Sequence, residues 1–326
     1  MRLKRELAIV NAVALSVACV MVAPAAAQVW PAQAVRIISP FSPGGGTDFV
    51  GRLLANNLAE QTGGTFLVDN RPGAAATIGA ATVARAQPDG YTLLISATEM
   101  SIHPILRATL PYDPLKDFVC ISQLTSGQFV LASHPAVPVK TVKQLIALAK
   151  ARPGQLNYGS SGTGSGTHLP GVLFELMAGV RWTHVPFKGA GASVIGLITG
   201  EIDFVFGSTA AVLPHARSGK VRAIAVTGPK RVTEIPNVQT INESLPGYQV
   251  TGWYGLYAPA GTSSDIVQRL YVESRRALMR PEVQETLRKS GNEPVASSPQ
   301  EFAAFLRAEI AKWAKVAEAS GLKKIN

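Results

Sequence analysis

The sequence has 326 residues, 47% of them hydrophobic and 16% charged, which excludes a disordered chain, a collagen-like repeat and a small disulfide scaffold. This length predicts two domains or one large α/β domain. Lysine and arginine outnumber acidic residues by 31 to 21, but no basic run is present and only 7% of residues are aromatic, so nucleic-acid binding is not expected.

The first 27 residues have the three parts of a secretory signal peptide. Basic residues at positions 2, 4 and 5 precede an apolar stretch at 7–22, and an Ala-x-Ala end closes at Ala27. The apolar stretch is short for a bilayer span, which needs about 20 residues. An uncleaved anchor and a lipoprotein acylated at Cys19 are the alternatives. We expect cleavage after Ala27 and a periplasmic product.

The second cysteine, Cys120, would be alone after cleavage, so no intramolecular disulfide is expected. It lies in the apolar, strand-like run 117–122. A buried, unreactive thiol is the expectation at such a position.

Short apolar runs alternate with helical periodicity along the first third of the chain. The pattern predicts strands at 35–41, 66–68 and 91–96 and helices at 48–61 and 75–86. Strands and helices that alternate at this spacing are typical of a parallel sheet covered by helices.

The same alternation restarts after residue 140. Thr141 and Gln144 are placed as a capping box at the start of the next predicted helix. Two such sets, each able to form its own core, predict two lobes. Helices are expected at 141–152, 168–178, 193–199, 265–279, 282–289 and 300–320, and strands at 156–158, 182–185, 203–206, 221–227 and 253–258.

Two glycine-rich turns lie directly between a predicted strand and a predicted helix. We call residues 41–48 the first glycine turn and residues 158–168 the second glycine turn. Glycines let the backbone approach a ligand, and free N–H groups at a helix start attract anions. The alternative is a pair of ordinary tight turns, with Thr47 or Asp48 as an N-cap. One turn in each lobe favours a shared anion site between the lobes.

The sequence has no nucleotide-binding fingerprint, nucleophile elbow or metal-ligand cluster, so no cofactor, metal or catalytic residue is predicted. His168 starts a helix and has two possible roles, bonding a ligand or bonding its own turn. Lys188 follows a strand and would be either a cationic ligand group or a solvated surface residue. Glu99 and Asp203 lie at strand or turn ends without the spacing of an acid–base pair.

Seven segments, in order, resemble the Bug family, the TctC-like substrate-binding receptors of tripartite tricarboxylate transporters. Each segment is weakly specific alone, but the ordered set is highly specific and covers nearly the whole chain after the signal peptide. The segments are 40–48, 69–74, 88–93, 110–114, 158–162 with 168–169, 184–189, and 253–256 with 258–262.

The resemblance implies an α/β, two-lobed periplasmic binding protein of the second topological type, which closes on its ligand like a hinge. Lobe one would comprise 28–124 and 254–326, and lobe two 125–253, with crossings near 125–128 and 249–253. The implied protein is a monomer that captures a small carboxylate solute and passes it to an inner-membrane permease or a sensor.

The resemblance also implies which residues hold the solute. The first glycine turn would grip a carboxylate, the second would close over it, and a cleft-edge segment and a far wall would complete the site. At the cleft edge an acid is unusual for the family, and Glu99 would disfavour a second carboxylate on the ligand and favour an amide, hydroxyl or ammonium. The implied residues are Phe41, Gly44, Gly45, Gly46, Thr47 and Asp48 of the first turn, Ser160, Ser161, Thr163 and His168 of the second, Thr98 and Glu99 at the edge, and Asp203, Ser208 and Thr209 in the wall.

Two other functions remain open at this point. One is an exported α/β hydrolase or transferase that uses a serine or histidine near the second glycine turn. The other is a purely structural envelope protein, which would leave the two facing glycine turns without a purpose.

Overall fold

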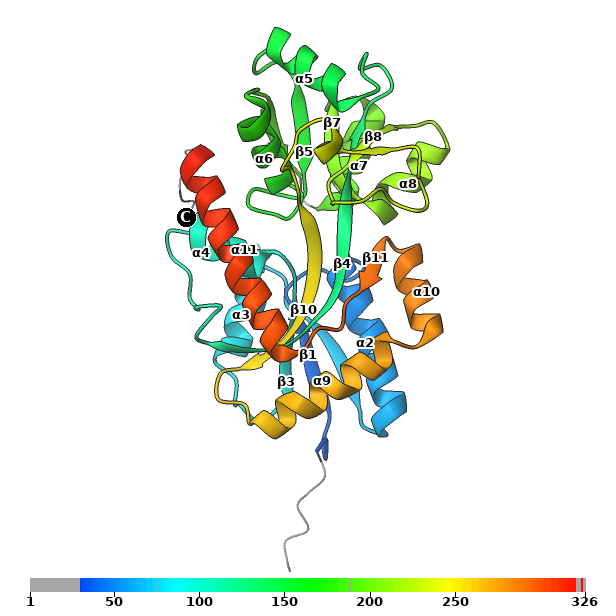
Figure 1. The fold of residues 1–326 in the computed structure, drawn as a ribbon. Helices are drawn as coiled ribbons and strands as arrows, with labels where there is room; N and C mark the ends of the chain where they lie inside the picture. Colours follow the sequence, from blue (N-terminus) through cyan, green and yellow to red (C-terminus); the bar gives the residue numbers. More distant parts are fainter. Residues whose placement is uncertain (1–29, 75, 188, 321–323, 325–326) are drawn as a thin grey trace, which may run out of the picture.

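The computed structural model describes residues 30–74, 76–187, 189–320 and 324. The predicted signal peptide and Lys188 lie outside these residues. The chain forms two lobes joined by long strands (Figure 1). In the described part of the chain, no helix has the length and apolar character needed to cross a membrane.

The first lobe is built on three parallel strands. β1 (Val35–Ser39) lies between β2 (Phe66–Asn70) and β3 (Thr92–Ser96). Helices α2 (Gly46–Thr62) and α3 (Thr77–Ala84) make the connections between these strands. Parallel strands with helical crossovers place the loops after the strands at one edge of the sheet, which is where α/β ligand sites form.

Two long strands continue from one lobe into the other. β10 (Thr251–Pro259) runs antiparallel to β3 and to β4 (Phe118–Ser133). β4 pairs with β10 as far as Gln128, and from Phe129 onward it pairs with strands of the second lobe. Figure 1 shows both strands passing between the lobes. Helix α4 (Glu99–Leu106) lies between β3 and β4 in the sequence, at the end of the first lobe that faces the second.

The second lobe repeats the strand–helix alternation around a sheet that continues from β4. β7 pairs antiparallel with β4 and parallel with β5, and β5 pairs parallel with β6. The elements of this lobe are α5 (Val142–Ala151), β5 (Asn157–Ser160), α6 (Leu169–Ala178), β6 (Thr183–Pro186), α7 (Ala190–Thr199), β7 (Phe204–Ser208), α8 (Thr209–Arg217), β8 (Arg222–Val226), β9 (Gln239–Thr240) and the 3₁₀ turn η1 (Ile241–Glu243).

After β10 the chain returns to the first lobe. Helix α9 (Ser264–Leu278) packs against α2, and α10 (Pro281–Lys289) leads into β11 (Asn292–Pro294), which pairs with β4. Helix α11 (Pro299–Ser320) packs on α4 and reaches α6 of the second lobe.

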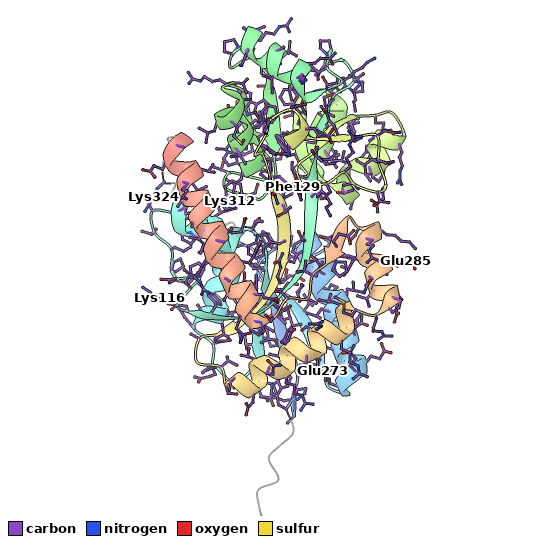
Figure 2. The ribbon with its side chains drawn as sticks, viewed as in Figure 1. Lys116, Phe129, Glu273, Glu285, Lys312 and Lys324 are labelled. Carbon is purple, nitrogen blue, oxygen red and sulfur yellow. The ribbon has the colours of Figure 1, made fainter. Side chains whose placement is uncertain are left out.

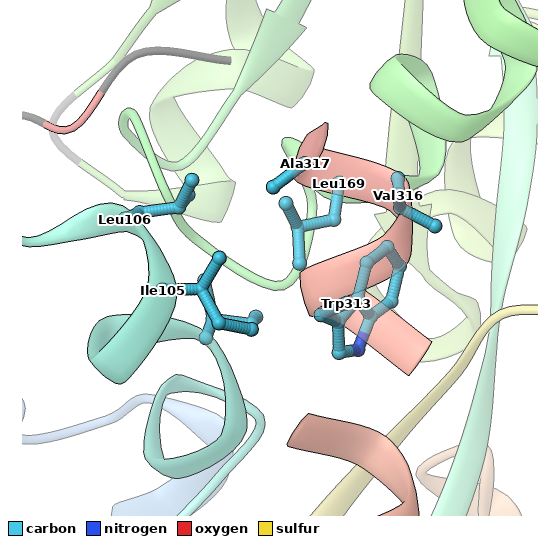
Figure 3. A pocket seen from close by; sticks show the side chains of 7 residues that line it. Ile105, Leu106, Leu169, Trp313, Val316 and Ala317 are labelled. Atoms are coloured by element: carbon cyan, nitrogen blue, oxygen red, sulfur yellow. The ribbon is translucent and has the colours of Figure 1, made fainter. Parts of the chain in front are cut away.

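One apolar core extends across both lobes. Ile102 of α4 and Trp313 and Val316 of α11 belong to the same buried cluster as Leu169 of α6 and the interior of the second lobe. Figure 3 shows these side chains around a void of about 10 Å³. A void this small and apolar has no polar partners for a water molecule, so it is a packing defect and not a binding site. The contact joins the two lobes along α11.

The helices and strands listed above from the alternating pattern are all present, with ends displaced by up to three residues. The strand-like run at 117–122 is the start of the much longer β4, which continues to Ser133. Two helices were not predicted, and both contain a proline: Pro104 in α4 and Pro214 in α8. The capping box is half formed. Thr141 Oγ1 accepts from Gln144 N at 3.2 Å, but Gln144 Oε1 accepts from Lys140 N, one residue before the N-cap.

Substituting Gly255 tests the packing of β10 against α11. A Cβ at Gly255 would overlap the Phe302 ring of α11. We expect Gly255→Ala to lower the free energy of unfolding by about 1–3 kcal/mol, the usual cost of overpacking a core. Chemical denaturation measures this change.

Two controls accompany this prediction. Gly191→Ala on α7 adds a methyl group that meets nothing within 4 Å, so it should be neutral or slightly stabilising. In a Phe302→Leu background the cost of Gly255→Ala should shrink. An unchanged cost in that background would show that the ring is not the cause.

Candidate functional site

The first glycine turn leaves a helix start without a side-chain cap. The N-cap of α2 is Gly45, and Gly44 adopts a left-handed φ of 82°. Phe49 N is the first amide to bond within the helix, to Gly45 O at 2.9 Å. The N–H groups of Gly46, Thr47 and Asp48 therefore have no helical acceptor and can serve an anion.

Asp48 holds this turn in shape. Its Oδ2 accepts hydrogen bonds from Gly44 N and from Arg52 Nε, both at 3.0 Å. Burial alone would raise the pKa of Asp48, but the hydrogen bonds from Arg52, Gly44 and Asn70 outweigh it and lower the pKa. The alternative with Thr47 or Asp48 as N-cap is wrong, because the N-cap is Gly45 and both residues lie within the first turn of α2. Arg52 is occupied by Asp48, so it is not a free cation for a ligand.

Tyr254 of β10 packs against the first glycine turn at Gly46. A Cβ at Gly46 would overlap the Tyr254 hydroxyl, so glycine is required for the turn to lie this close to the strand. Tyr254 pairs across β10 and β4 with Thr125. The first glycine turn is thus fixed to one of the two strands that connect the lobes.

Several buried hydroxyl and carboxyl oxygens at this edge of the first sheet have no hydrogen-bond partner among the residues that the structure describes. They are Ser39 Oγ at the end of β1, Ser96 Oγ at the end of β3, Glu99 Oε2 and Thr125 Oγ1. The register places Ser96 opposite Gly255, beside Tyr254 and its partner Thr125. Buried polar groups in native proteins are nearly always paired, so each of these oxygens is a place where a polar solute or water can bond.

Sequence reasoning named Glu99 in this group but missed Ser39, Ser96, Thr125 and Tyr254. The sequence gives one usable signal, since Ser39 and Ser96 each end a strand of the parallel sheet. No such rule identifies Thr125 or Tyr254, because they lie inside long antiparallel strands.

The second glycine turn is fastened by its own hydroxyl groups. Ser160, fully buried at the end of β5, accepts from Gly162 N at 3.1 Å and lies 2.7 Å from His184 Nε2. Ser161 Oγ and Thr167 Oγ1 bond at 2.8 Å. Among the predicted residues of this turn, Thr163 alone is exposed.

Two neutral histidines lie beneath this turn. His168 Nδ1 accepts from Gly164 N at 3.2 Å, and the rings of His168 and His184 are 4.1 Å apart. Burial lowers the pKa of His168 to about 3, with His184 adding to the effect, and burial lowers the pKa of His184 to about 4. Both imidazoles are therefore uncharged near pH 7. His168 bonds its own turn, which was one of its two expected roles.

The two lobes touch where the second glycine turn meets the start of α4. A Cβ at Gly166 would lie 2.6 Å from Thr98 Oγ1 and 3.5 Å from Phe129 Cζ. Phe129 lies on β4 between the lobes, as Figure 2 shows. Thr98 and Glu99 are thereby brought beside the second glycine turn. Phe129 was not predicted, and its apolar strand position gives no signal of this role.

The predicted far wall is only partly brought together. Thr209 Oγ1 donates to Gln128 O of β4 at 3.2 Å, and Ser208 Oγ caps α8 by accepting from Ala211 N at 3.3 Å. Asp203 lies elsewhere: its Oδ2 accepts from Asn157 N at 2.7 Å, where β5 begins. Because β5 and β7 are parallel, Asp203 and Ser160 lie at opposite edges of the sheet.

Ser160 and His184 are the serine and histidine that an exported hydrolase or transferase would use near the second glycine turn. The distance of 2.7 Å suits a nucleophile and its base, but Ser160 is fully buried and its hydroxyl also bonds Gly162. In the described part of the chain, no carboxylate bonds His184, and no group of three or more metal-ligating side chains occurs. Cys120 is buried as predicted, and burial raises the pKa of its thiol to about 12.

The fold is that of a periplasmic binding protein. It has two lobes joined by long crossing strands, and each lobe has a glycine turn at the start of a helix near the other lobe. The family model of the tripartite tricarboxylate transporter family receptor, TctC, matches residues 50–322. The chain belongs to this family, whose members are periplasmic solute-binding receptors. The family and the two-lobed α/β fold expected from the resemblance are confirmed.

Relatives and solved structures cover nearly the whole chain. The protein BugT of Bordetella pertussis strain Tohama I is 35% identical over 304 residues, which is 92% of this chain and 93% of BugT. The structure of R. palustris Rpa4515 with adipate is 36% identical, with a TM-score of 0.85 over 91% of this chain and 100% of that one. MatC from Rhodopseudomonas palustris with bound malate is 32% identical, with a TM-score of 0.80 over 88% of this chain and 99% of that one.

The close packing of Gly46 against Tyr254 can be tested by stability. We expect Gly46→Ala to lower the midpoint of thermal unfolding, because the methyl group must displace either the tyrosine or the turn. Gly45→Ala is the matched control, since its Cβ would lie 3.6 Å from Ser42 O, an ordinary contact. In a Tyr254→Leu background Gly46→Ala should cost less. Equal effects of the Gly45 and Gly46 variants would contradict this packing.

Proposed function

We propose that this protein captures a small carboxylate-bearing solute between its lobes. One observation carries the proposal: the free helix N–H groups of the first glycine turn and several unbonded buried oxygens lie at the same edge of the first sheet. The similar structures with adipate and with malate support it, because both of those ligands are carboxylates. The residues of this chain that would take part are those of the two turns and of the Thr98–Glu99 segment.

The carboxylate would be held by backbone dipoles and not by a side-chain cation. Arg52 is bonded to Asp48, and His168 and His184 are neutral. The N-terminus of α2 supplies partial positive charge and three N–H donors in a fixed direction. Such a grip recognises a carboxylate group without specifying the remainder of the molecule.

The division into lobes proposed for this function is 28–124 with 254–326, and 125–253. Thr251 and Gln128 form the last pair between β10 and β4, and from Phe129 onward β4 pairs with β7. A hinge at this point would disturb few hydrogen bonds of the sheet. Closing brings the second glycine turn against Thr98. The shared apolar contact along α11 would keep the lobes in register as they move.

The route of the protein and its partners complete the proposal. The chain would be exported by its first 27 residues, cleaved after Ala27, and act as a monomer in the periplasm. It would hand its solute to an inner-membrane permease or present its closed form to a sensor. The solute is returned unchanged, because the buried Ser160 hydroxyl has no access to a substrate.

Thermal unfolding of the mature protein, refolded to strip retained ligand, tests carboxylate capture. The panel comprises mono-, di- and tricarboxylates, aromatic acids, amino acids and amides. A ligand at 100 times its dissociation constant adds about 2.7 kcal/mol of stability. We expect at least one carboxylate to raise the midpoint and to be recovered intact by mass spectrometry. A stabilising compound that is converted during incubation would favour the enzyme, and a well-folded sample without any response would contradict the proposal.

Gly166 provides a test of closure. We expect Gly166→Ala to weaken binding of the best panel carboxylate by about tenfold or more, because the methyl group meets Thr98 Oγ1 as the lobes close. Isothermal titration calorimetry measures the affinity, and the Thr98→Ala variant and the double variant complete a cycle. If the contact is the cause, the double variant binds no worse than Thr98→Ala alone. Unchanged affinity in Gly166→Ala would rule out close approach at this point.

A further inference from the structure

Glu99 is a buried acid with an unpaired carboxylate oxygen. It begins α4 shortly after β3 and is 8% exposed, and its Oε2 has no hydrogen-bond partner among the described residues. In the described part of the chain, no lysine or arginine forms an ion pair with it. A buried carboxylate normally has a cation or several hydrogen-bond donors around it. Burial raises the pKa of Glu99 to about 7, against only its own backbone N–H to lower it.

The position of Glu99 relates it to both glycine turns. Its neighbour Thr98 meets Gly166 of the second turn. The pKa of Tyr254, which packs on Gly46 of the first turn, is raised to about 12 by burial and by the nearby Glu99. Glu99 is thus next in the chain to a residue that meets the second glycine turn, and its charge acts on a tyrosine that packs against the first.

The other ionisable groups around α4 do not compensate this charge. His103, which bonds Tyr112, is neutral because burial lowers its pKa to about 4. Arg107 Nη2 donates to Ala74 O. The groups on which the charge of Glu99 acts are three phenols, those of Tyr112, Tyr254 and Tyr257. On α11, which packs against α4, Lys312 is paired with Glu309.

We propose that Glu99 is a specificity-determining residue of this receptor, accepting a hydrogen bond from an N–H or O–H donor on the far end of the bound carboxylate. Ligands with an ammonium, amide or hydroxyl group there are selected over dicarboxylates. This inference rests on the proposed function and narrows its substrate class. It separates the chain from the similar proteins whose structures hold adipate and malate, both of which are dicarboxylates.

The physical reason is the cost of like charges in a buried place. A second carboxylate beside Glu99 must either face another negative charge or force Glu99 to take up a proton. An ammonium group supplies a cation that the described residues do not place beside Glu99, and an amide or hydroxyl satisfies the unpaired oxygen without adding charge.

Calorimetry with length-matched ligands tests the inference. One series is succinate, succinamate and 3-aminopropanoate, and the other is adipate, its half-amide and 5-aminopentanoate. At pH 8, we expect the wild-type protein to bind the half-amide or the amino acid about tenfold or more tighter than the dicarboxylate in at least one series. Glu99→Gln should remove about tenfold of this preference, mainly by improving dicarboxylate binding. Glu201→Gln, an exposed acid in the second lobe, should leave the ratio unchanged.

The outcomes separate this inference from the proposed function. If the ligands bind but wild type and Glu99→Gln show the same ratio, or wild type prefers the dicarboxylate, Glu99 does not select the ligand and carboxylate capture still stands. If no carboxylate of the wider panel binds the wild-type protein, the proposed function fails and this inference fails with it. If the wider panel gives ligands but neither series binds, the inference is tested by the same comparison on the best of those ligands and its half-amide.

A proton count on the wild-type protein gives a readout that does not depend on the variant folding. Titrations at pH 7 in two buffers of different ionisation enthalpy measure the protons exchanged on binding. A donor-bearing ligand lowers the pKa of Glu99, so proton release is expected, whereas a dicarboxylate should cause proton uptake. Absence of any difference between the two ligand types would overturn the inference, as would equal release from a folded Glu99→Gln variant.

Discussion

The parallel pairing of β1 with β3 determines where the rest of the site lies. It brings the first glycine turn, Ser39, Ser96 and the start of α4 to one edge of the first sheet. β10 lies directly beside β3 and extends with β4 into the second lobe, so the same edge faces the second glycine turn. Without this arrangement, Thr98 and Gly166 would not meet. The strand order of the sheet therefore determines where the site lies, and the side chains determine what it binds.

Among the residues that the structure describes, the cations and histidines near the first and second glycine turns are already paired or neutral. Asp48 uses Arg52 to fix the first glycine turn, and burial keeps His168 and His184 neutral. The positive end of α2 remains as the source of attraction. Against this background a single unpaired acid such as Glu99 carries unusual weight, because no ion pair offsets it among the described residues. The start of α2 would therefore recognise the carboxylate that all ligands share, and Glu99 would discriminate between ligands at their other end.

The sequence predicted the alternation of strands and helices because buried apolar runs and helical periodicity are local features. It did not predict α4 or α8, since Pro104 and Pro214 lie within them and proline removes a helix hydrogen bond. It identified both glycine turns, but it placed Asp203 with Ser208, although the strand between them puts the two at opposite ends. Thr125, Phe129 and Tyr254 depend on the pairing of distant strands, which no local pattern encodes.

A crystal structure of the mature protein with its best carboxylate ligand tests the central claim most directly. The account predicts that both carboxylate oxygens accept hydrogen bonds from the backbone N–H groups at the start of α2, directly or through one water, with the second glycine turn closed over them. A carboxylate paired with an arginine or lysine side chain, or a ligand bound away from the two turns, would contradict it.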